Sequence, residues 1–463
     1  MTNSSHNTPT HWWSRWDTSV SLDSLACLRI LFGVTMSLGT LRFVSSGWIE
    51  ELFVRPNYFF KYPGFEWVPV WSPTGLYIHF SIALLSSLMV ALGWYYRTSM
   101  TIFLCSFLGI QLLDASNYLN HYYLVLCVGT VLLCLPANGQ WSIDAMRYRH
   151  KARQTYPIWG LYLLRFQVGI VYIYAAIAKL GSDWLFHAQP LSIWLSARQD
   201  LPVLGPLLAS PYAAYTMSWG GLVYDASIVL FLLYRPTRKL AYFAVLGFHG
   251  MTFLLFDIGM FPLIMIVLTT IFFEPTYPRQ FLGRWRIETA SPSPTQHPRT
   301  SQFKVVLIGC WCAFHLVFPF RHLWMEHDVL WSEQGMRYSW RVMVREKMGS
   351  ITYQVKRKSD GRIFEINPSK YLEPRQMSEM SGQPDLIRQL AFYVKMDFER
   401  RHGPAAAVTV RALVSLNGRA PALMIDPNVD LTSTSFNNDG WLLPAPTDAP
   451  LSPWGHSVAR TQE

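Results

Sequence analysis

Long apolar runs dominate the sequence and constrain its fold more than any other feature. About 20 consecutive apolar residues suffice for a helix to cross the ~30 Å hydrocarbon core of a bilayer. Runs of near-spanning length cover residues 25–44, 76–94, 99–113, 121–137, 160–180, 215–234 and 303–320. A further apolar stretch, residues 239–273, would reach roughly 50 Å as one helix at about 1.5 Å per residue, so we expect two helices that turn near Asp257-Ile258-Gly259. The sequence therefore predicts a mainly α polytopic membrane bundle with about nine crossings.

Basic residues in the connecting loops indicate how this bundle is oriented. Nine crossings place alternate loops on opposite faces, and cytoplasmic loops carry an excess of Lys and Arg. One set of loops carries Arg97, Arg147, Arg149, Lys151, Arg153, Arg235, Arg238, Lys239, Arg279, Arg284, Arg286 and Arg299, whereas the opposite set carries Arg55, Lys61 and Arg198. We therefore expect a cytoplasmic N-terminus and an exoplasmic C-terminal region. Because these loops largely explain the net charge of +10, we expect no nucleic-acid partner.

Composition divides the chain into three parts. Residues 1–20 form a polar N-terminal segment, residues 21–320 contain the apolar runs, and charged residues return in 321–463. In this last part, Ser359-Asp360-Gly361 separates two strand-like runs, and Asn417-Gly418 is a strong hairpin signal. Asp385 is a candidate N-cap for a helix between them. We therefore predict a smaller α+β exoplasmic domain after the transmembrane domain.

Lys179, at the end of the run 160–180, is the most informative single residue. An ammonium at membrane depth usually pairs with a carboxylate, loses its proton or lies in a polar cavity, so it is by default a functional candidate. The predicted topology brings several other conspicuous residues to the same exoplasmic end, namely Asn120, His121, Asp257, Gly259, Met260 and Phe261. His249 lies roughly two turns deeper, and Asp225 lies mid-span beside Gly220 and Gly221.

Each of these residues also has a purely structural interpretation. A lysine near a helix end can extend its ammonium to the membrane interface, and Asn120-His121 can simply cap a helix. Asp225 and His249 can be hydrogen-bonded groups that hold the bundle together. Their clustering, rather than any single residue, favours a site. The sequence contains no Cys-x-x-Cys, His-Glu-x-x-His or P-loop pattern, so we expect no metal.

Ordered motifs along most of the chain carry a resemblance to a known family. In the apolar part they are Leu28-Arg29-Ile30-Leu31-Phe32-Gly33, Asn120-His121, Trp141-Ser142-Ile143-Asp144, Ile170-Val171-Tyr172, Lys179-Leu180, Asp183-Trp184, Gly220-Gly221-Leu222 with Asp225, Phe248-His249 with Phe256, and Ile258-Gly259-Met260-Phe261. In the C-terminal part they are Tyr338-Ser339-Trp340, Val414-Ser415-Leu416-Asn417, Asp426-Pro427 and Val429-Asp430. With these motifs the chain resembles the vitamin K-dependent γ-glutamyl carboxylases and their shorter bacterial homologues, which share the HTTM membrane domain.

The resemblance implies a carbon–carbon lyase that couples oxidation of reduced vitamin K, from hydroquinone to epoxide, to γ-carboxylation of peptide glutamate with CO2 and O2. Its partners would be membrane lipid, the quinone and a glutamate-containing peptide. By the same resemblance, Lys179 would deprotonate the hydroquinone, Asn120 would hydrogen-bond the quinone oxygen and His121 would assist carboxylation. The residues implied to contact the cofactor are Tyr172, Asn120, Met260 and Phe261, and those implied in support are Asp225, His249, Asp183 and Trp184.

The chain also departs from the animal members of this family. Those are much longer and carry an exoplasmic disulfide, whereas all six cysteines here fall within predicted spans. The length favours a bacterial homologue in an inner membrane, and the resemblance carries no expectation of propeptide recognition. A membrane quinol oxidoreductase without peptide carboxylation is the alternative function. A transporter or scaffold is a weaker alternative, because its polar residues should lie nearer the bilayer midplane.

Overall fold

The computed structural model describes residues 16–202, 204–282, 300–433, 440–451 and 453. Within these residues, a helix forms at each of the nine predicted positions. These helices are α1 (Asp23–Ser45), α2 (Pro73–Leu92), α3 (Tyr96–Gln111), α4 (Asn120–Cys134), α6 (Ile158–Ala178), α10 (Pro211–Leu233), α11 (Arg238–Leu255), α12 (Phe261–Thr269) and α14 (Gln302–Val317). The stretch 239–273 is therefore two helices, as predicted. Residues 1–15 of the predicted N-terminal segment, together with Arg284, Arg286 and Arg299, lie outside the described residues.

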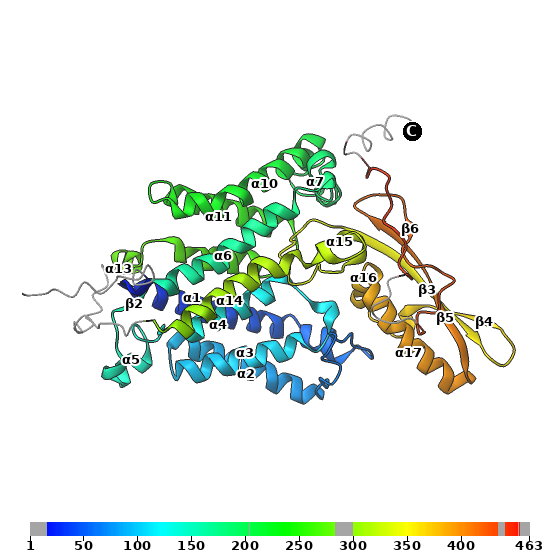
Figure 1. Cartoon of the computed structure of the whole chain (residues 1–463), viewed down its shortest axis with the longest axis horizontal. Helices are drawn as coiled ribbons and strands as arrows, with labels where there is room; N and C mark the ends of the chain where they lie inside the picture. Colours follow the sequence, from blue (N-terminus) through cyan, green and yellow to red (C-terminus); the bar gives the residue numbers. More distant parts are fainter. Residues whose placement is uncertain (1–15, 203, 283–299, 434–439, 452, 454–463) are drawn as a thin grey trace, which may run out of the picture.

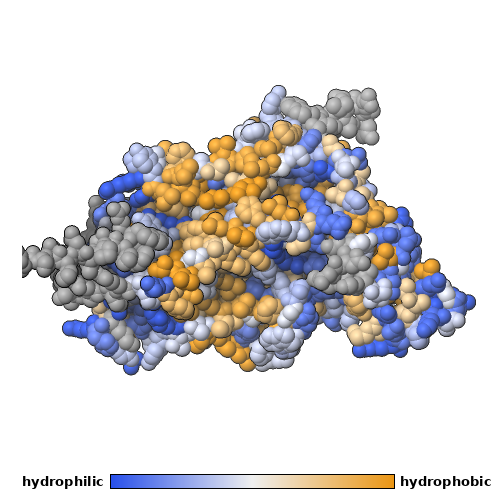
Figure 2. Space-filling view, in the orientation of Figure 1, coloured by the Kyte–Doolittle hydropathy of each residue, from blue (hydrophilic) through white to orange (hydrophobic). Residues whose placement is uncertain are grey.

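Several of these helices have the length and composition of membrane spans. Within the described ranges, five are long and apolar enough to cross a bilayer, namely α1, α2, α6, α10 and the helical segment Gln302–Trp324. The helix α4 and the segment Phe261–Phe272 are shorter apolar helices. Apolar side chains gather over the helices, and hydrophilic ones gather towards both ends of the long axis (Figure 2). The chain is thus an integral membrane protein, whereas the count of nine crossings and the orientation stay predictions.

Short elements connect the long helices. Strand β1 (Ser19–Ser21) pairs antiparallel with β2 (Thr155–Pro157), at the end of the bundle where Figure 1 also places α5 (Ile143–Arg147) and α13 (Tyr277–Leu282). The segment between α6 and α10 contains α7 (Ser182–His187), α8 (Leu191–Ser196) and α9 (Gly205–Leu208). Short segments of 3-10 or π helix are η2 (Glu50–Val54), η3 (Ala115–Asn117), η4 (Arg149–Lys151), η5 (Thr270–Phe272), η6 (Phe318–Trp324) and η7 (Pro368–Lys370).

The C-terminal part contains a four-stranded antiparallel sheet in the order β4-β3-β5-β6, at one end of the helical bundle (Figure 1). Its strands are β3 (Lys347–Arg357), β4 (Ile363–Ile366), β5 (Ala405–Leu416) and β6 (Ala422–Leu423). Both predicted hairpins form, β3 with β4 around Asp360-Gly361 and β5 with β6 after Asn417-Gly418. A long pairing of β3 with β5, in which Ile351 faces Ala412, joins the two hairpins into one sheet.

Helices cover one face of this sheet. The C-terminal part contains α15 (Val329–Ser332), α16 (Pro374–Ser381) and α17 (Pro384–His402), and both α16 and α17 pack against β3. Alternate residues of β3, among them Tyr353 and Val355, are buried with Leu386 of α17. The prediction that Asp385 caps α17 is wrong, because Gln383 occupies the N-cap position. Asp385 instead lies in the first turn, where a carboxylate is also favoured, and accepts a hydrogen bond from Arg337.

Candidate active site

Lys179 is held at the point where α6 ends. Its backbone N–H bonds to the carbonyl of Ala176, and Gly181 then leads in an extended conformation into α7. The lysine is buried, with only 5% of its surface exposed. Its Nζ lies 2.7 Å from Asp225 Oδ2 on α10 and 3.3 Å from the carbonyl oxygen of Ala175. The ammonium therefore forms a buried ion pair and does not reach the membrane interface.

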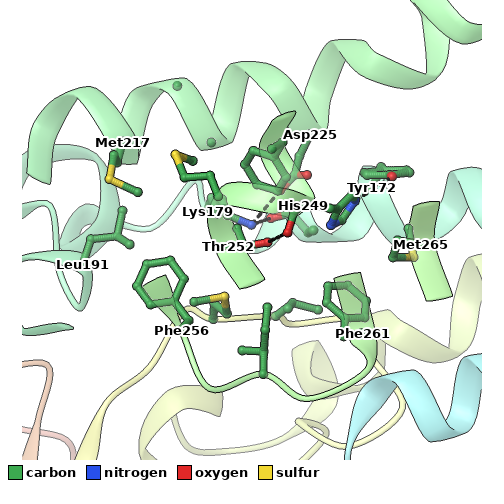
Figure 3. A pocket seen from close by; sticks show the side chains of 18 of the residues that line it. Tyr172, Lys179, Leu191, Met217, Asp225, His249, Thr252, Phe256, Phe261 and Met265 are labelled. Carbon is green, nitrogen blue, oxygen red and sulfur yellow. Dashed lines mark hydrogen bonds and ion pairs between the residues drawn. The ribbon is translucent and has the colours of Figure 1, made fainter. Parts of the chain in front are cut away.

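A cavity of about 280 Å³ lies in front of this ion pair. Its walls come mainly from α6, α10, α11 and α12, and α7, α8 and residues 342 and 343 contribute the rest. Figure 3 shows Lys179, Asp225, His249 and Thr252 close together. The rest of the wall is mainly apolar and includes Tyr172, Trp184, Leu191, Met217, Phe248, Met251, Phe256, Phe261 and Met265. Mostly apolar walls with a few convergent polar groups are typical of small-molecule sites.

His249 and Tyr172 form a second polar pair in this wall. The Tyr172 hydroxyl lies 3.0 Å from His249 Nε2, and Thr252 Oγ1 donates to the backbone carbonyl of His249 at 3.0 Å. His249 is 1% exposed, and its Nδ1 has no hydrogen-bond partner among the described residues. If the tyrosine donates to Nε2, Nδ1 carries the imidazole proton and can donate to a ligand oxygen. A buried, unpaired polar atom is unfavourable by about 1–3 kcal/mol, so a bound oxygen would be stabilised here.

Trp184 of α7 lies beside the ion pair and connects α7 to α10. Its indole N–H donates to the carbonyl of Ser218 at 2.7 Å, and the Ser218 hydroxyl bonds back to the carbonyl of Trp184. The Lys179 Nζ is 5.2 Å from the centre of the indole ring. A cation at this distance from an aromatic ring is attracted by its π-electrons. Trp184 therefore stabilises the ammonium and also lines the cavity.

The structure separates Asn120 from Lys179, although the predicted topology places both at one end of the bundle. Asn120 Oδ1 accepts a hydrogen bond from the Tyr118 hydroxyl at 3.0 Å, and Nδ2 donates to the carbonyl of Arg341 at 3.3 Å. Leu119, and not Asn120, is the N-cap residue of α4. The Lys179 cavity does not include Asn120, which lines a second cavity described below.

His121 and Met260 lie behind the cavity wall. The ring of buried His121 is 6.0 Å from the ring of Phe261, which does line the cavity. Met260 packs against Gly39 of α1: a Cβ added at Gly39 would lie only 3.7 Å from Met260 Cε. Of the predicted cofactor contacts, the structure therefore brings Tyr172 and Phe261 to the cavity, whereas His121 and Met260 support it from behind.

A second cavity, of about 270 Å³, lies between the start of α4 and the C-terminal domain. It is polar, and its charged lining residues are Glu333, Arg337, Arg341, Arg345 and Glu379. Arg345 Nε pairs with Glu333 at 2.8 Å, and Arg341 donates to His322 Nε2 at 2.7 Å. Met343 lines both cavities, so the two are neighbours. This cavity was not predicted from the sequence, in which its one signal is an arginine at every fourth residue, Arg337, Arg341 and Arg345, beside Tyr338-Ser339-Trp340.

Asp183 joins the membrane bundle to the C-terminal domain instead of lining the cavity. Its two carboxylate oxygens accept hydrogen bonds from Arg419 at 2.6 and 2.7 Å, and Asn417 Nδ2 donates to it at 2.9 Å. Burial raises the pKa of Asp183, but these bonds outweigh burial and hold the pKa below its ordinary value. The bidentate geometry is the strong form of an arginine–carboxylate contact. Asp183 therefore supports the site through domain docking.

The helical bundle, the buried amine in an apolar cavity and the attached sheet domain define an integral membrane protein with an enzyme-like site. The family model of the HTTM domain matches residues 18–277, more than half of the chain. That of the vitamin K-dependent gamma-carboxylase lumenal domain matches residues 300–448. The chain belongs to this HTTM-containing carboxylase family, which confirms the resemblance seen in its motifs and implies use of reduced vitamin K. No solved structure matches the chain.

Proposed function

We propose that this chain couples oxidation of reduced vitamin K, from hydroquinone to epoxide, to γ-carboxylation of peptide glutamate with CO2 and O2. The observation that carries the proposal is a buried Lys179–Asp225 pair in an apolar cavity that shares Met343 with an arginine-lined cavity. The first cavity suits an apolar aromatic quinol, and the second suits a carboxylate. Two such sites side by side match the two substrates of the reaction.

The residues of the first cavity fit a quinol. Phe256 and Phe261 offer apolar surface for a ring, and the unpaired Nδ1 of His249 offers a donor for one oxygen. Lys179 and Asp225 offer polar atoms for the other oxygen of the quinol. When bound, reduced vitamin K supplies, on oxidation by O2, a base strong enough to remove the γ-proton of glutamate, after which CO2 adds to that carbon. The role of the protein is to bind the ring, activate its hydroxyl and exclude water.

Lys179 is the proposed proton acceptor in the first step. A base must hold a lone pair, and the lysine gains one if its proton moves from Nζ to Asp225 Oδ2 along their 2.7 Å contact. The neutral amine then accepts the hydroxyl proton of the quinol. Asp225 thus stores one proton while Lys179 takes up another. Trp184 stabilises the resulting ammonium through its ring.

The second cavity is the proposed position of the glutamate side chain. Guanidinium groups bind carboxylates with two parallel hydrogen bonds. Arg341 lines this cavity and contacts His322 Nε2 without an ion pair among the described residues, whereas Arg345 is already paired with Glu333. Asn120, at the start of α4, lies on the membrane side of it, and His121 follows next in the chain. The edge strand β4 has backbone groups that an extended peptide could join, whereas the chain directly after β6 is already bonded to residues 441–443. We therefore assign Asn120 and His121 to the carboxylation side of the reaction.

We further propose residues 21–320 as the transmembrane domain and residues 321–463 as the exoplasmic domain, in a bacterial inner membrane with a cytoplasmic N-terminus. The asymmetry of basic loops supports this orientation. A peptide cannot cross the bilayer to reach the second cavity, so the substrate must arrive on the side of the sheet domain. The docking of that domain through Asp183 and Arg419 holds the two cavities together.

One assay tests the proposal against its alternative, a membrane quinol oxidoreductase. The purified full chain is supplied with labelled CO2, O2 and a glutamate-containing peptide, with and without reduced vitamin K, and both epoxide and peptide-bound label are measured. Label that depends on reduced vitamin K is the expected result. Epoxide without peptide label would favour the oxidoreductase, and formation of neither product would refute both functions.

A further inference from the structure

Among the described residues, Arg341 is the arginine of the second cavity without a carboxylate partner. Arg337 pairs with Asp385 at 2.7 Å, and Arg345 pairs with Glu333 at 2.8 Å. The side chain of Arg341 instead contacts a neutral acceptor. A guanidinium donates up to five hydrogen bonds in a fixed planar fork. How well Arg341 binds a ligand therefore depends on how firmly this fork is held.

Contacts at both ends hold Arg341 in place. Its backbone carbonyl accepts a hydrogen bond from Asn120 Nδ2, at the start of α4, at 3.3 Å. At the tip of the side chain, Nη2 donates to His322 Nε2 of η6 at 2.7 Å. Neither Nε nor Nη1 is bonded to another residue in the described part of the chain. The contact with His322 thus fixes the guanidinium and leaves two of its nitrogens for a ligand.

The second hydrogen bond of the imidazole makes His322 a fixed acceptor. Its Nδ1 lies 3.0 Å from the backbone carbonyl oxygen of Pro319, and a carbonyl can only accept, so Nδ1 carries the proton. Nε2 of the neutral ring then holds a lone pair, which Arg341 requires because a guanidinium has no acceptor. Both neighbours therefore select the same tautomer. Because the imidazole is neutral, it orients Arg341 without cancelling its charge, as a carboxylate would.

The backbone at Gly335 allows His322 to reach this position. Gly335 has a φ of +78°, and a Cβ added there would lie 2.8 Å from the Cβ of His322. Glycine is therefore required both by the conformation and by the contact. Arg321, next to His322, donates to the backbone carbonyl of Arg337. These contacts join η6 to the segment that leads into Arg341, so the imidazole and the guanidinium are both supported.

We propose that His322 is a positioning residue, which holds the guanidinium of Arg341 ready for the side-chain carboxylate of the glutamate substrate. This inference rests on the proposed function, in which the second cavity receives that carboxylate. An arginine that is already ordered loses less conformational freedom on binding, so its affinity for the carboxylate is higher. His322 does not line the cavity and therefore acts through Arg341 and not on the substrate itself.

Peptide binding to the full chain in lipid nanodiscs, measured without quinol, tests this role. Two peptides are compared, one with a glutamate and one in which glutamine replaces it. His322→Leu should weaken binding of the glutamate peptide about tenfold, because Arg341 loses its acceptor, and leave binding of the glutamine peptide unchanged. His322→Gln should bind nearly as well as wild type, because its amide oxygen can accept from Arg341. His402→Leu is the matched control, since His402 is exposed on α17 and does not line the cavity.

A double variant and turnover kinetics separate positioning from a general structural effect. In the Arg341→Gln background, His322→Leu should cause no further loss of affinity for the glutamate peptide, because the group that it positions is already absent. In turnover, His322→Leu should raise the KM for the peptide about tenfold. The value of kcat should stay constant, as expected when a variant weakens ground-state and transition-state binding equally.

The possible outcomes separate this inference from the proposed function. Wild-type affinity in His322→Leu would overturn it, as would an equal loss in His322→Leu and His322→Gln at unchanged unfolding temperature, or a further loss in the double variant. If His322→Leu does not fold, Gly335→Ala displaces the imidazole through its added Cβ and should cause the same selective loss; unchanged affinity there would also overturn the inference. A wild type that does not prefer the glutamate peptide over the glutamine peptide would instead refute the second cavity as a carboxylate site, and with it the proposed function.

Discussion

Lys179 Nζ and Asp225 Oδ2 are 2.7 Å apart, although the two residues come from different helices and both are almost fully buried. A buried ion pair is weak evidence for stability, because desolvation of both charges offsets their attraction. Removing one partner is nevertheless strongly unfavourable, since it leaves a single charge in an apolar site. The pair is therefore better explained by chemistry that needs a movable proton than by stabilisation of the bundle.

Replacement of the carboxylate tests this explanation. Asp225→Asn keeps the shape and a hydrogen-bonding oxygen but removes the proton acceptor, so epoxide formation should fall by about 10²- to 10⁴-fold, the usual contribution of positioned acid–base groups. Initial rates of epoxide formation measure the effect, and the unfolding temperature controls for folding. A wild-type rate in Asp225→Asn would show that Lys179 loses its proton by another route.

Replacement of the amine tests the proposed base directly. Lys179→Ala should abolish epoxidation and carboxylation together, because both depend on deprotonation of the quinol. A small exogenous amine that enters the vacated space should restore part of the epoxide yield. Lys239→Ala, on the exposed surface at the start of α11, is the matched control and should keep full activity. Full activity in Lys179→Ala would rule out its role as base.

The sequence predicted elements better than it predicted contacts. Spanning helices follow from apolar length alone, and the hairpins at Asp360-Gly361 and Asn417-Gly418 follow from local turn chemistry. The pairing of β3 with β5 could not be predicted, because no local signal records which hairpins meet. Lys179 stood out because a charge at membrane depth is rare, but its partner depended on how α6 and α10 rotate against each other.

The separation of Asn120 from Lys179 has the same origin. Both residues occupy the same end of the bundle, so the topology predicted one site. Depth along the membrane normal is fixed by the apolar runs, whereas position around the bundle depends on packing of side chains from several helices. The structure places a wall between them, formed in part by Met343, and thereby divides one predicted site into two cavities.

The arginines of the second cavity should govern peptide affinity. Arg341→Gln is expected to raise the KM for a glutamate peptide by roughly tenfold to a hundredfold, since hydrogen bonds to charged groups contribute about 1.5–3 kcal/mol. Epoxidation in the absence of peptide should change little. The exposed Arg362 of the β3–β4 turn provides the control Arg362→Gln, which should leave KM unchanged. An unaltered KM in Arg341→Gln would place the glutamate side chain elsewhere.

The contact between Asp183 and Arg419 should couple the two domains. Asp183→Asn and Arg419→Gln are each expected to destabilise the protein by about 3 kcal/mol, because each leaves the partner charge buried without its counter-ion. The double variant should be less destabilised than the sum of the single variants. Carboxylation should fall more than epoxidation, because the two cavities lose their alignment. If the decreases in unfolding temperature of the two single variants simply add up in the double variant, the contact between Asp183 and Arg419 does not link the domains.

Lys347 provides a pH-dependent prediction from outside the membrane. Its Nζ is buried beneath the sheet, donates to the carbonyls of Trp331 and Gly382 and lies 3.5 Å from Glu333. Burial lowers the pKa of Lys347 from 10.5 to about 8. Between these two pH values the unfolded chain binds more protons than the folded chain, so stability rises with pH across this window. At 1.36 kcal/mol for each pH unit between the two pKa values, the full rise is about 3 kcal/mol, most of it reached by pH 10.

Lys347→Met should remove this rise. The variant loses its hydrogen bonds to Trp331 and Gly382 at every pH, which lowers its stability by a constant amount. The gap in unfolding temperature between wild type and Lys347→Met should therefore widen in favour of the wild type from pH 7 to pH 10. Lys356→Met, at an exposed position of β3, should show a constant gap over the same range. If the gap for Lys347→Met narrows as pH rises, folding raises the pKa of Lys347 instead of lowering it, and the folded protein favours the charged amine.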